Sequence, residues 1–552
     1  MIAGIDLGTT HSLVGVMESG FPVLIADERG QRLTPSAVWF DADSEEHLVG
    51  WPALEKRKTD PAQVVTSVKR LMGTRASESS LRVHLGGKPL LPEEVSALIL
   101  SKLKTDLEKA CGHVVDRAVI TVPAYFNDAQ RSATKRAGEA AGFTVERLLS
   151  EPTAAALAYG LDRLGEDARV AVYDLGGGTF DISVLELRKG VFEVLSTNGD
   201  TRLGGDDLDA ALAAAWGIPL TDAEKIKRHL TDADSFDCDG KTYFRDDLDR
   251  ICQPVVDRTR AHCLQSLADA HFETSSLDAV VLVGGATRMP LVRRFVASLF
   301  GREPDVSQHP DEAVAFGATI QAGILEGGLQ NVTLLDVTPL SLGIETFGGL
   351  MNVIIPRNTT IPCKAGEMFT NAVANQASMR ISVLQGEREM ARDNWKLGEM
   401  DVVFTPSPKG QARVGVQFEL DANGILHVLA RDTVTLRDTV VQIQSAVEVS
   451  DEAVEKMLGD SLEHAFEDMD ERIFTEAKIK ADEMLPAIAA ALFQLEGDVP
   501  DGIHLEIDRL VLAVRSAIEG RSTSQLKALL KELDTITEPL ATALIEKTLA
   551  GA

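Results

Sequence analysis

The sequence predicts a multidomain protein in which an α/β part is followed by an all-β module and a helical C-terminal region. The chain has 552 residues, which corresponds to about three to five domains of ordinary size. Hydrophobic residues make up 44% and charged residues 25% of the chain, as in ordinary globular proteins, so it can bury hydrophobic cores. The order of strand-like and helix-like segments along the chain divides it into three sections.

The first section, residues 1–327, alternates strand-like and helix-like runs. Residues 169–173 are a strand-like run, and residues 208–215 are rich in alanine and leucine and read as helix. This alternation is typical of α/β architecture. We therefore expect an α/β domain over residues 1–327.

The later sections carry different signals. Residues 338–447 contain short alternating runs separated by turn residues, and Asn423-Gly424 between two such runs is a strong hairpin signal, so we expect an all-β module. From residue 448 the strand signals end. Ser450 with the acidic residues after it is typical of a helix start, and apolar residues then recur at helical spacing. Residues 448–552 are therefore predicted to be helical, with acidic faces in solvent.

Charge and cysteine usage exclude several classes of protein. Lysine and arginine number 55 against 84 aspartate and glutamate, and the net charge of −29 would repel a nucleic-acid backbone. The five cysteines are scattered without a C-x-x-C pair and are expected to be reduced thiols. No stretch reaches the roughly 18 apolar residues of a membrane span, and the first residues do not resemble a signal peptide. We expect a cytoplasmic protein with no nucleic-acid or membrane partner.

An internal repeat points to phosphate binding. Residues 2–10 and 170–181 both read as strand, aspartate, Gly-rich turn with threonine, and strand. Glycines in such turns let backbone N–H groups approach an anion, and threonine hydroxyls add donors. Asp6 and Asp174 each end an apolar strand, where a carboxylate is costly unless it faces a cation, so together they suggest a hydrated Mg²⁺. One copy could be an ordinary hairpin, but two copies favour function.

A third glycine pair, Gly284-Gly285, follows the apolar run 279–283 and precedes a predicted helix. A flat ligand approaching the backbone closely would explain it, with Arg288 free to stack on a base. A tight strand-to-helix turn explains it equally well.

Four motifs together carry a resemblance to a known family. Residues 6–10, 174–181, 283–285 and 335–346 look like those of the DnaK-type, seventy-kilodalton heat-shock chaperones, and the resemblance spans essentially the whole chain. It implies a two-lobed, actin-like ATPase domain over residues 1–327, a linker over 328–337, a β-sandwich that binds extended peptides over 338–447 and a helical lid over 448–552.

The resemblance also implies roles for individual residues. The catalytic residues would be Asp6, Lys69, Glu151, Asp174 and Thr179, with Asp6 and Asp174 holding Mg²⁺ through water and Lys69 bridging the γ-phosphate and the attacking water. The nucleotide-binding residues would be Gly8, Thr9, Thr10, Gly176, Gly177, Gly178, Gly204, Gly205, Glu224, Lys227, Arg228, Gly284, Gly285, Arg288 and Asp311. Without the resemblance, Lys69 reads as a surface charge, Glu151 as a charge at a helix N-terminus, and residues 224–228 as a solvated helix face.

Two further groups follow from the same resemblance. The peptide-binding residues would be Ile344, Thr346, Phe347, Phe369, Ala372, Met379 and Ile381, although any one of them alone reads as sandwich core. The residues that relay the nucleotide state would be Pro123, Arg131, Leu334, Leu335 and Asp336. Thr333 places a hydroxyl beside the linker leucines, which leaves the strength of coupling between domains open.

The resemblance implies ATP and Mg²⁺ as cofactors, with K⁺ as a further candidate, and a J-domain co-chaperone and extended apolar client segments as partners. Residues 67–73, 190–195, 354–362 and 461–469 are similar to those of the HscA-like branch, which serves iron-sulfur cluster assembly. A cluster scaffold protein is therefore a candidate client. The stretch between Gly205 and Glu224 is shorter than usual in the family, which leaves the need for an exchange factor open.

Other functions share part of the pattern. A small-molecule kinase or an actin-like filament protein would share the phosphate hairpins but would have no use for residues 338–447. A third alternative is a regulatory relative that binds ATP without meaningful hydrolysis, and the presence of Asp6, Lys69, Glu151, Asp174 and Thr179 argues against it. A general-purpose folding chaperone that binds unfolded proteins in the stress response stands beside the iron-sulfur specialist. The sequence does not reveal the client, the turnover rate or the oligomeric state.

Overall fold

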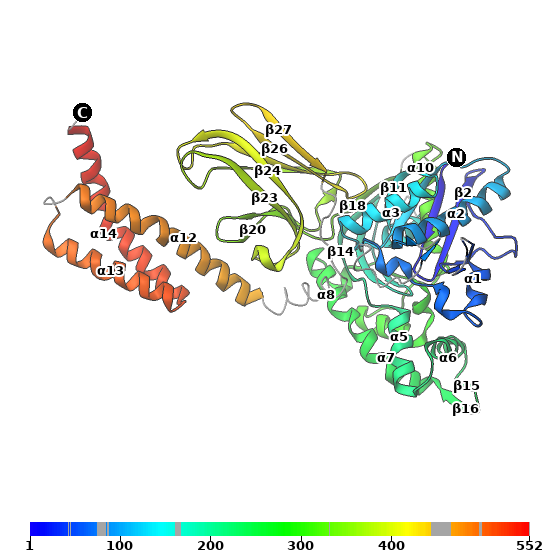
Figure 1. The fold of residues 1–552 in the computed structure, drawn as a ribbon. Helices are drawn as coiled ribbons and strands as arrows, with labels where there is room; N and C mark the ends of the chain where they lie inside the picture. The colour runs from blue at the N-terminus through cyan, green and yellow to red at the C-terminus, as the bar shows by residue number, and fades with distance from the viewer. Residues whose placement is uncertain are drawn as a thin grey trace. The chain divides into compact units, whose positions relative to one another are not determined.

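The computed structural model describes residues 1–41, 44, 46–73, 84–85, 88–160, 167–329, 332–442, 465–495 and 499–550. The chain divides into two compact units. Figure 1 labels helices and strands of both units along the chain. The first unit comprises Met1–Leu342, Val353–Gln385 and Lys396–Glu455. The second unit comprises Gly343–Asn352, Gly386–Trp395 and Lys456–Ala552.

The first sheet of unit 1 has the order β11-β10-β1-β2-β3, with β4 also paired to β2. β1 and β2 form an antiparallel hairpin, and β1 runs parallel to β10. Every residue of β1 is buried, as expected for a strand covered on both faces. The bounds are β1 Ala3–Leu7, β2 His11–Glu18, β3 Phe21–Leu24, β4 Thr34–Pro35, β10 Arg117–Val122 and β11 Thr144–Ser150.

The second sheet has the order β17-β12-β13-β14-β18-β21. β12 and β13 form an antiparallel hairpin, and β12 runs parallel to β17. The bounds are β12 Ala168–Leu175, β13 Phe180–Arg188, β14 Val191–Asp200, β17 Ala279–Val283, β18 Thr333–Val337 and β21 Thr360–Ile361. Each sheet thus has a hairpin whose first strand also has a parallel neighbour, so the sequence repeat corresponds to a repeat in topology.

Two helices of small apolar residues, α4 (Glu151–Gly160) and α10 (Ala313–Leu325), pack against each other. α10 lies on β1, β2 and β10, and α4 lies on β12 and β13. All residues of α4 are buried. Gly317 is required here because a Cβ at this position would overlap the Ala154 carbonyl. The close packing of these two helices joins the two sheets.

The two largest hydrophobic cores of the α/β part combine residues of these sheets with residues of the remaining elements. α2 (Pro92–Cys111) and α3 (Asp128–Ala140) cover the first sheet. The other helices are α1 Trp51–Lys56, α5 Gly205–Trp216, α6 Leu220–Asp232, α7 Arg245–Asp257, α8 Thr259–Asp269 and α9 Pro290–Phe300. The short strands are β5 Val38–Phe40, β6 His47–Val49, β7 Val64–Val65, β8 His84–Leu85, β9 Lys88–Pro89, β15 Ser235–Cys238 and β16 Lys241–Phe244.

The predicted all-β module contains two four-stranded sheets, β22-β25-β26-β27 and β20-β19-β23-β24. The predicted Asn423-Gly424 hairpin joins β25 to β26, and Gly424 has a φ of +75°, which favours glycine. The bounds are β19 Leu342–Thr346, β20 Leu350–Ile355, β22 Cys363–Phe369, β23 Gln376–Gln385, β24 Trp395–Ser407, β25 Val414–Leu420, β26 Leu426–Asp432 and β27 Arg437–Gln442.

Unit 2 contains α12 (Ala465–Gln494), α13 (Asp501–Glu519) and α14 (Thr523–Ala550), which share one hydrophobic core. A bidentate ion pair between Arg388 and Asp468 fixes α12 to the segment Gly386–Trp395 of the same unit. The predicted helix start at Ser450 and the predicted boundary between residues 447 and 448 lie outside the described residues. Within the described ranges, none of the helices is both long and apolar enough to cross a membrane.

Candidate active site

The turns of the two predicted phosphate hairpins face each other. Gly8–Thr10 joins β1 to β2, and Gly176–Thr179 joins β12 to β13. A Cβ added at Gly178 would lie 2.7 Å from Thr9 Cγ2, so the two turns touch and leave no room for a side chain there. Backbone N–H groups and threonine hydroxyls from both turns can therefore face one anion.

Two further glycine pairs pack against the second turn. Gly205 N–H donates to the Gly176 carbonyl at 2.9 Å, where α5 begins. Gly284 has a φ of +84°, and a Cβ there would lie 2.6 Å from Asp174 Oδ1. Gly285 starts a single turn of 3-10 helix, so the predicted strand-to-helix turn is present with one irregular step. The predicted glycine-rich segments thus come together around one region of unit 1.

Four buried carboxylates and one buried lysine lie at this region. Asp6, Glu151, Asp174 and Asp181 are each at most 9% exposed, and Lys69 is 3% exposed. Lys69 Nζ forms an ion pair with Glu151 Oε1. Four carboxylates against one ammonium group are costly to bury unless protons or a cation add positive charge.

Burial is the main influence on the pKa of these carboxyls. It raises the pKa of Asp6 to about 7 and that of Asp181 to about 8, and it raises the pKa of Asp174 well above its usual value. The negative charge of Glu151 acts in the same direction on all three, and the ammonium of Lys69 opposes it. A divalent cation would favour the ionised carboxylates, so this group of residues fits Mg²⁺.

Within the part of the chain that the structure describes, no group of three or more His, Cys, Asp or Glu side chains is arranged to hold a metal ion directly. Water ligands would have to complete the coordination of a cation held by Asp6 and Asp174, which suits Mg²⁺. Sequence reasoning did not assign Asp181 to the site. Its signal is its place as the last residue of the 174–181 motif, where β13 begins beside Asp174.

Lys69 is not the surface charge that its sequence context alone suggests. It lies in a short 3-10 helix that follows Ser67, whose φ of +54° is left-handed. Ser67 Oγ donates to Asp206 Oδ2 at 3.0 Å, and Arg70 Nη2 donates to the Gly178 carbonyl at 2.7 Å. These two bonds attach the segment that carries Lys69 to the second phosphate turn and to α5. Sequence reasoning missed this role of Arg70.

Glu224, Lys227 and Arg228 on α6 are expected to form a solvated helix face without the resemblance, and only part of this set is exposed to solvent. Glu224 and Arg228 form an ion pair at 2.9 Å. Lys227 Nζ donates to the Gly205 carbonyl and contacts Asp209, each at 2.9 Å. Lys227 therefore contacts the glycine pair at the start of α5, whereas Glu224 and Arg228 form an ion pair with each other.

Arg288 is held in place rather than free. Its Nε donates to Asp311 Oδ2 at 3.0 Å, and its Nη2 lies 3.0 Å from His309 Nε2. The side chain stays 42% exposed. A Cβ at Gly285 would lie 3.0 Å from Asp311 Oδ1, so Arg288 and Asp311 border the third glycine pair. A planar guanidinium oriented in this way can stack on a flat ligand.

The sequence model of a known family, described as "Hsp70 protein", matches residues 2–229 and 220–546. Together the two matches span nearly the whole chain. The chain belongs to the Hsp70 family. Hsp70 proteins are ATPases that act as ATP-dependent chaperones, so the match confirms the family that the motifs predicted. It is a match to the family as a whole, and the HscA-like branch stays a prediction.

Arg131, one of the residues expected to relay the nucleotide state in an Hsp70 protein, lies at the contact between α3 and the β25–β26 turn. Pro123 is buried after β10. Arg131 is 3% exposed, and its guanidinium donates to three backbone carbonyls, including that of Asn423 at 3.2 Å. Leu148 N–H donates to Asn423 Oδ1 at 2.8 Å. The β-rich part of unit 1 therefore contacts the first sheet and α3.

The expected linker residues form a strand. Leu334 and Leu335 are half-buried in β18 and pair with Phe192 and Glu193 of β14. Asp336 is 6% exposed, and its Oδ1 accepts a hydrogen bond from Val337 N at 2.9 Å. This segment extends the second sheet by one strand.

The residues expected to bind peptide are divided between the two units. Ile344, Thr346 and Phe347 belong to unit 2, and Phe369, Ala372, Met379 and Ile381 belong to unit 1. Ile344 and Ile381 are buried, Phe347 and Ala372 are exposed, and Thr346, Phe369 and Met379 are half-buried. Their assignment to peptide binding remains a prediction.

Proposed function

We propose that this Hsp70 protein is an ATP-driven chaperone in which residues 1–327 bind and hydrolyse ATP and residues 338–447 bind extended apolar peptide segments. Residues 328–337 would serve as the linker between the two, and residues 448–552 as the lid. The observation that carries the proposal is the buried carboxylate group with one lysine beside two facing Gly-Thr turns. Membership of the Hsp70 family supports it.

Hydrolysis of ATP does not require a covalent intermediate with the protein. Phosphoryl transfer to water depends on positioning and on neutralising the charge of the phosphates. Asp6 and Asp174 would hold Mg²⁺ through water, and the ion, when bound, would neutralise phosphate charge. Thr9, Thr10 and Thr179, with the glycines of both turns, would donate hydrogen bonds to phosphate oxygens.

Lys69 would orient the attacking water and place positive charge beside the γ-phosphate. Its ion pair with Glu151 and the bonds made by Ser67 and Arg70 keep the ammonium group in position before ATP arrives. Such preorganised charge is the main source of rate enhancement in sites of this kind. Arg288 and Asp311, with Glu224, Lys227 and Arg228, would bind the adenosine.

Peptide affinity would come from apolar burial together with backbone hydrogen bonds. Burying one leucine or isoleucine side chain contributes about 1.5–3 kcal/mol. With the backbone bonds of an extended segment added, micromolar affinity, equivalent to about 8 kcal/mol, is within reach. ATP would change this affinity by favouring one of two arrangements of the chain.

We propose that the client is an iron-sulfur cluster scaffold protein, which would make this chain a specialist for cluster assembly. The similarity of residues 67–73 and 354–362 to the HscA-like branch supports this client. Steady-state ATP turnover with a J-domain protein tests it. Turnover is measured with a purified scaffold protein and, separately, with a generic apolar peptide. Stimulation by the scaffold alone supports the specialist. Equal stimulation by the generic peptide replaces it with a general folding chaperone, and stimulation by neither contradicts the chaperone proposal.

A further inference from the structure

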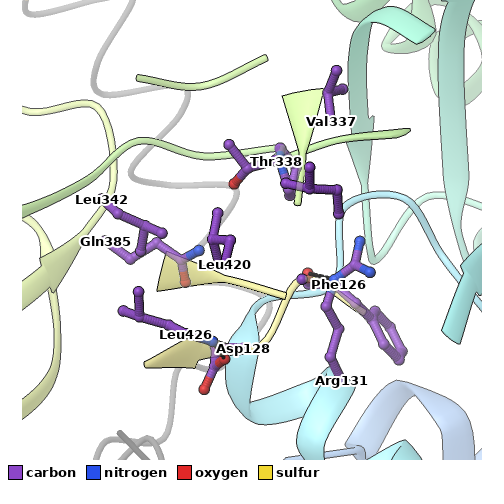
Figure 2. Close-up of a pocket in the computed structure, with 12 residues that line it drawn as sticks. Phe126, Asp128, Arg131, Val337, Thr338, Leu342, Gln385, Leu420 and Leu426 are labelled. Carbon is purple, nitrogen blue, oxygen red and sulfur yellow. Dashed lines mark hydrogen bonds between the residues drawn. The ribbon is translucent and has the colours of Figure 1, made fainter. Parts of the chain in front are cut away.

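A small cavity lies where α3, the segment after β18 and the β-rich part of unit 1 meet. Figure 2 shows it between Asp128 and Arg131 of α3, Val337 and Thr338, and Gln385 and Leu426. Its volume of about 10 Å³ is close to the least that a single water needs. The proposed site for ATP does not use this cavity or Asp128.

Two of the residues that line this cavity each carry a buried oxygen atom without a hydrogen-bond donor. Asp128 is 3% exposed and Gln385 is 4% exposed. Asp128 Oδ1 accepts from Leu426 N at 2.9 Å, but its Oδ2 is buried without a partner. Gln385 Oε1 is likewise buried without a partner. A buried carboxylate oxygen and a buried amide oxygen that both lack a donor are destabilising, and the carboxylate is the more so because it is charged.

The charged groups around Asp128 do not supply this donor. Arg131, three residues along α3, donates to three backbone carbonyls. Arg136, farther along α3, pairs with Glu93 at 2.6 Å. Asp421, from the β25–β26 turn, adds a further negative charge. The cavity lining contributed by residues 337–342 and by β23 contains no titratable side chain.

We propose that the contact between α3 and the β-rich part is linked to a proton: the docked arrangement binds one on Asp128 Oδ2, and docking weakens when this carboxyl ionises. The proton removes the negative charge from the buried Oδ2, while Oδ1 keeps its bond from Leu426. When the two surfaces separate, Asp128 meets water and releases the proton to solvent.

The electrostatics of Asp128 agree with this geometry. Burial raises its pKa to about 7, against the lowering effects of the Leu426 N–H bond and of Arg131. With an ordinary value near 4 in the separated state, the docking constant would fall as pH rises from about 4 to about 7 and then level off. Between pH 6 and pH 8 the fall is about tenfold. The inference depends only on the contact between α3 and the β-rich part of unit 1. If the proposed function holds, the same proton also affects the coupling between ATP binding and peptide binding.

The test uses amide hydrogen exchange in the full chain without nucleotide, at several pH values from 6 to 8, corrected for intrinsic exchange rates. The peptides followed contain Leu426 and Leu148, whose amides donate across the contact. Protection in the wild-type chain should fall about tenfold from pH 6 to pH 8. Asp128→Asn, whose amide supplies hydrogen atoms at every pH, should reduce this dependence to less than about twofold. Glu139→Gln, an exposed carboxyl on the same helix, should behave as wild type.

Two results would overturn the proposal. Wild-type protection that is the same at pH 6 and pH 8 would mean that Asp128 stays ionised and that a water in the cavity, or the Gln385 amide, supplies the hydrogen atoms. This result does not depend on whether Asp128→Asn folds. Retention of the full tenfold dependence in folded Asp128→Asn would mean that another group binds the proton. Neither result touches the ATPase proposal, which turnover at a fixed pH tests separately.

Discussion

Replacing Lys69 with alanine tests the candidate active site most sharply, because Lys69 is the only ammonium group paired within the buried carboxylate group described here. The substitution removes the partner of Glu151, which is 8% exposed. ATP should still bind, since the glycine turns and threonines remain. Hydrolysis should be nearly lost, since no positive side chain would then orient the water.

The expected magnitudes follow from burial. Removing one partner of a buried ion pair costs about 3–5 kcal/mol, because the other charge is left without compensation. Loss of a preorganised charge at the reacting phosphate lowers the rate by about 10²–10³-fold. The double variant Lys69→Ala/Glu151→Gln removes the uncompensated charge, so it should recover most of the stability while hydrolysis stays low.

The assay combines single-turnover hydrolysis of bound ATP, ATP affinity from equilibrium titration, and thermal unfolding. Lys135→Ala, on α3 and outside the site, is the matched control and should match wild type in all three measurements. Hydrolysis by Lys69→Ala at the wild-type rate would remove Lys69 from its proposed role. Recovery of hydrolysis in the double variant would show that the loss came from disturbed folding rather than from missing charge.

Three other outcomes are expected. Arg388→Ala should destabilise the α12 contact in unit 2 by about 3–5 kcal/mol in thermal unfolding, because Asp468 is left buried and unpaired; an unchanged midpoint would contradict this. Gly178→Ala should weaken ATP binding by about 1–3 kcal/mol, because the new Cβ would press on Thr9, whereas Gly502→Ala meets open space; equal affinities would contradict the close contact of the two turns. The pKa is raised to about 7 for Asp6 and to about 8 for Asp181, so the folded state holds protons that the unfolded state releases. Without Mg²⁺, the free energy of unfolding should therefore fall as pH rises from 6 to 8.5, and Mg²⁺ with ADP should reduce this fall. A melting temperature that does not change with pH in EDTA would contradict this.

The order of elements followed from local patterns, because each pattern is a property of neighbouring residues. The two Gly-Thr hairpins, the helix over 208–215 and the Asn423-Gly424 turn all depend on residues within a few positions of one another. The repeated motif forms one hairpin in each of the two sheets, β1–β2 and β12–β13. These parts of the fold needed no knowledge of distant contacts.

What the patterns could not give are the contacts between distant segments. From its sequence context alone, Lys69 is expected to be a surface charge. Its partner Glu151 lies 82 residues away in sequence, and no residue near Lys69 indicates this pairing. The linker forms β18 because β14 offers an unpaired edge, which no property of residues 333–337 reveals. Asp181 and Asp128 are ordinary aspartates in sequence, and only burial changes their behaviour. The family resemblance supplied the proposed role of Lys69, and the structure supplied its burial and its ion pair with Glu151.

The central claim is that ATP controls the binding of an extended peptide. The rate at which a fluorescent apolar peptide dissociates from the full chain, measured with ADP and then with Mg²⁺ and ATP, tests it directly. The proposed function predicts that dissociation is faster with ATP and that Lys69→Ala keeps this acceleration while no longer hydrolysing the nucleotide. Dissociation at the same rate with both nucleotides would contradict the claim.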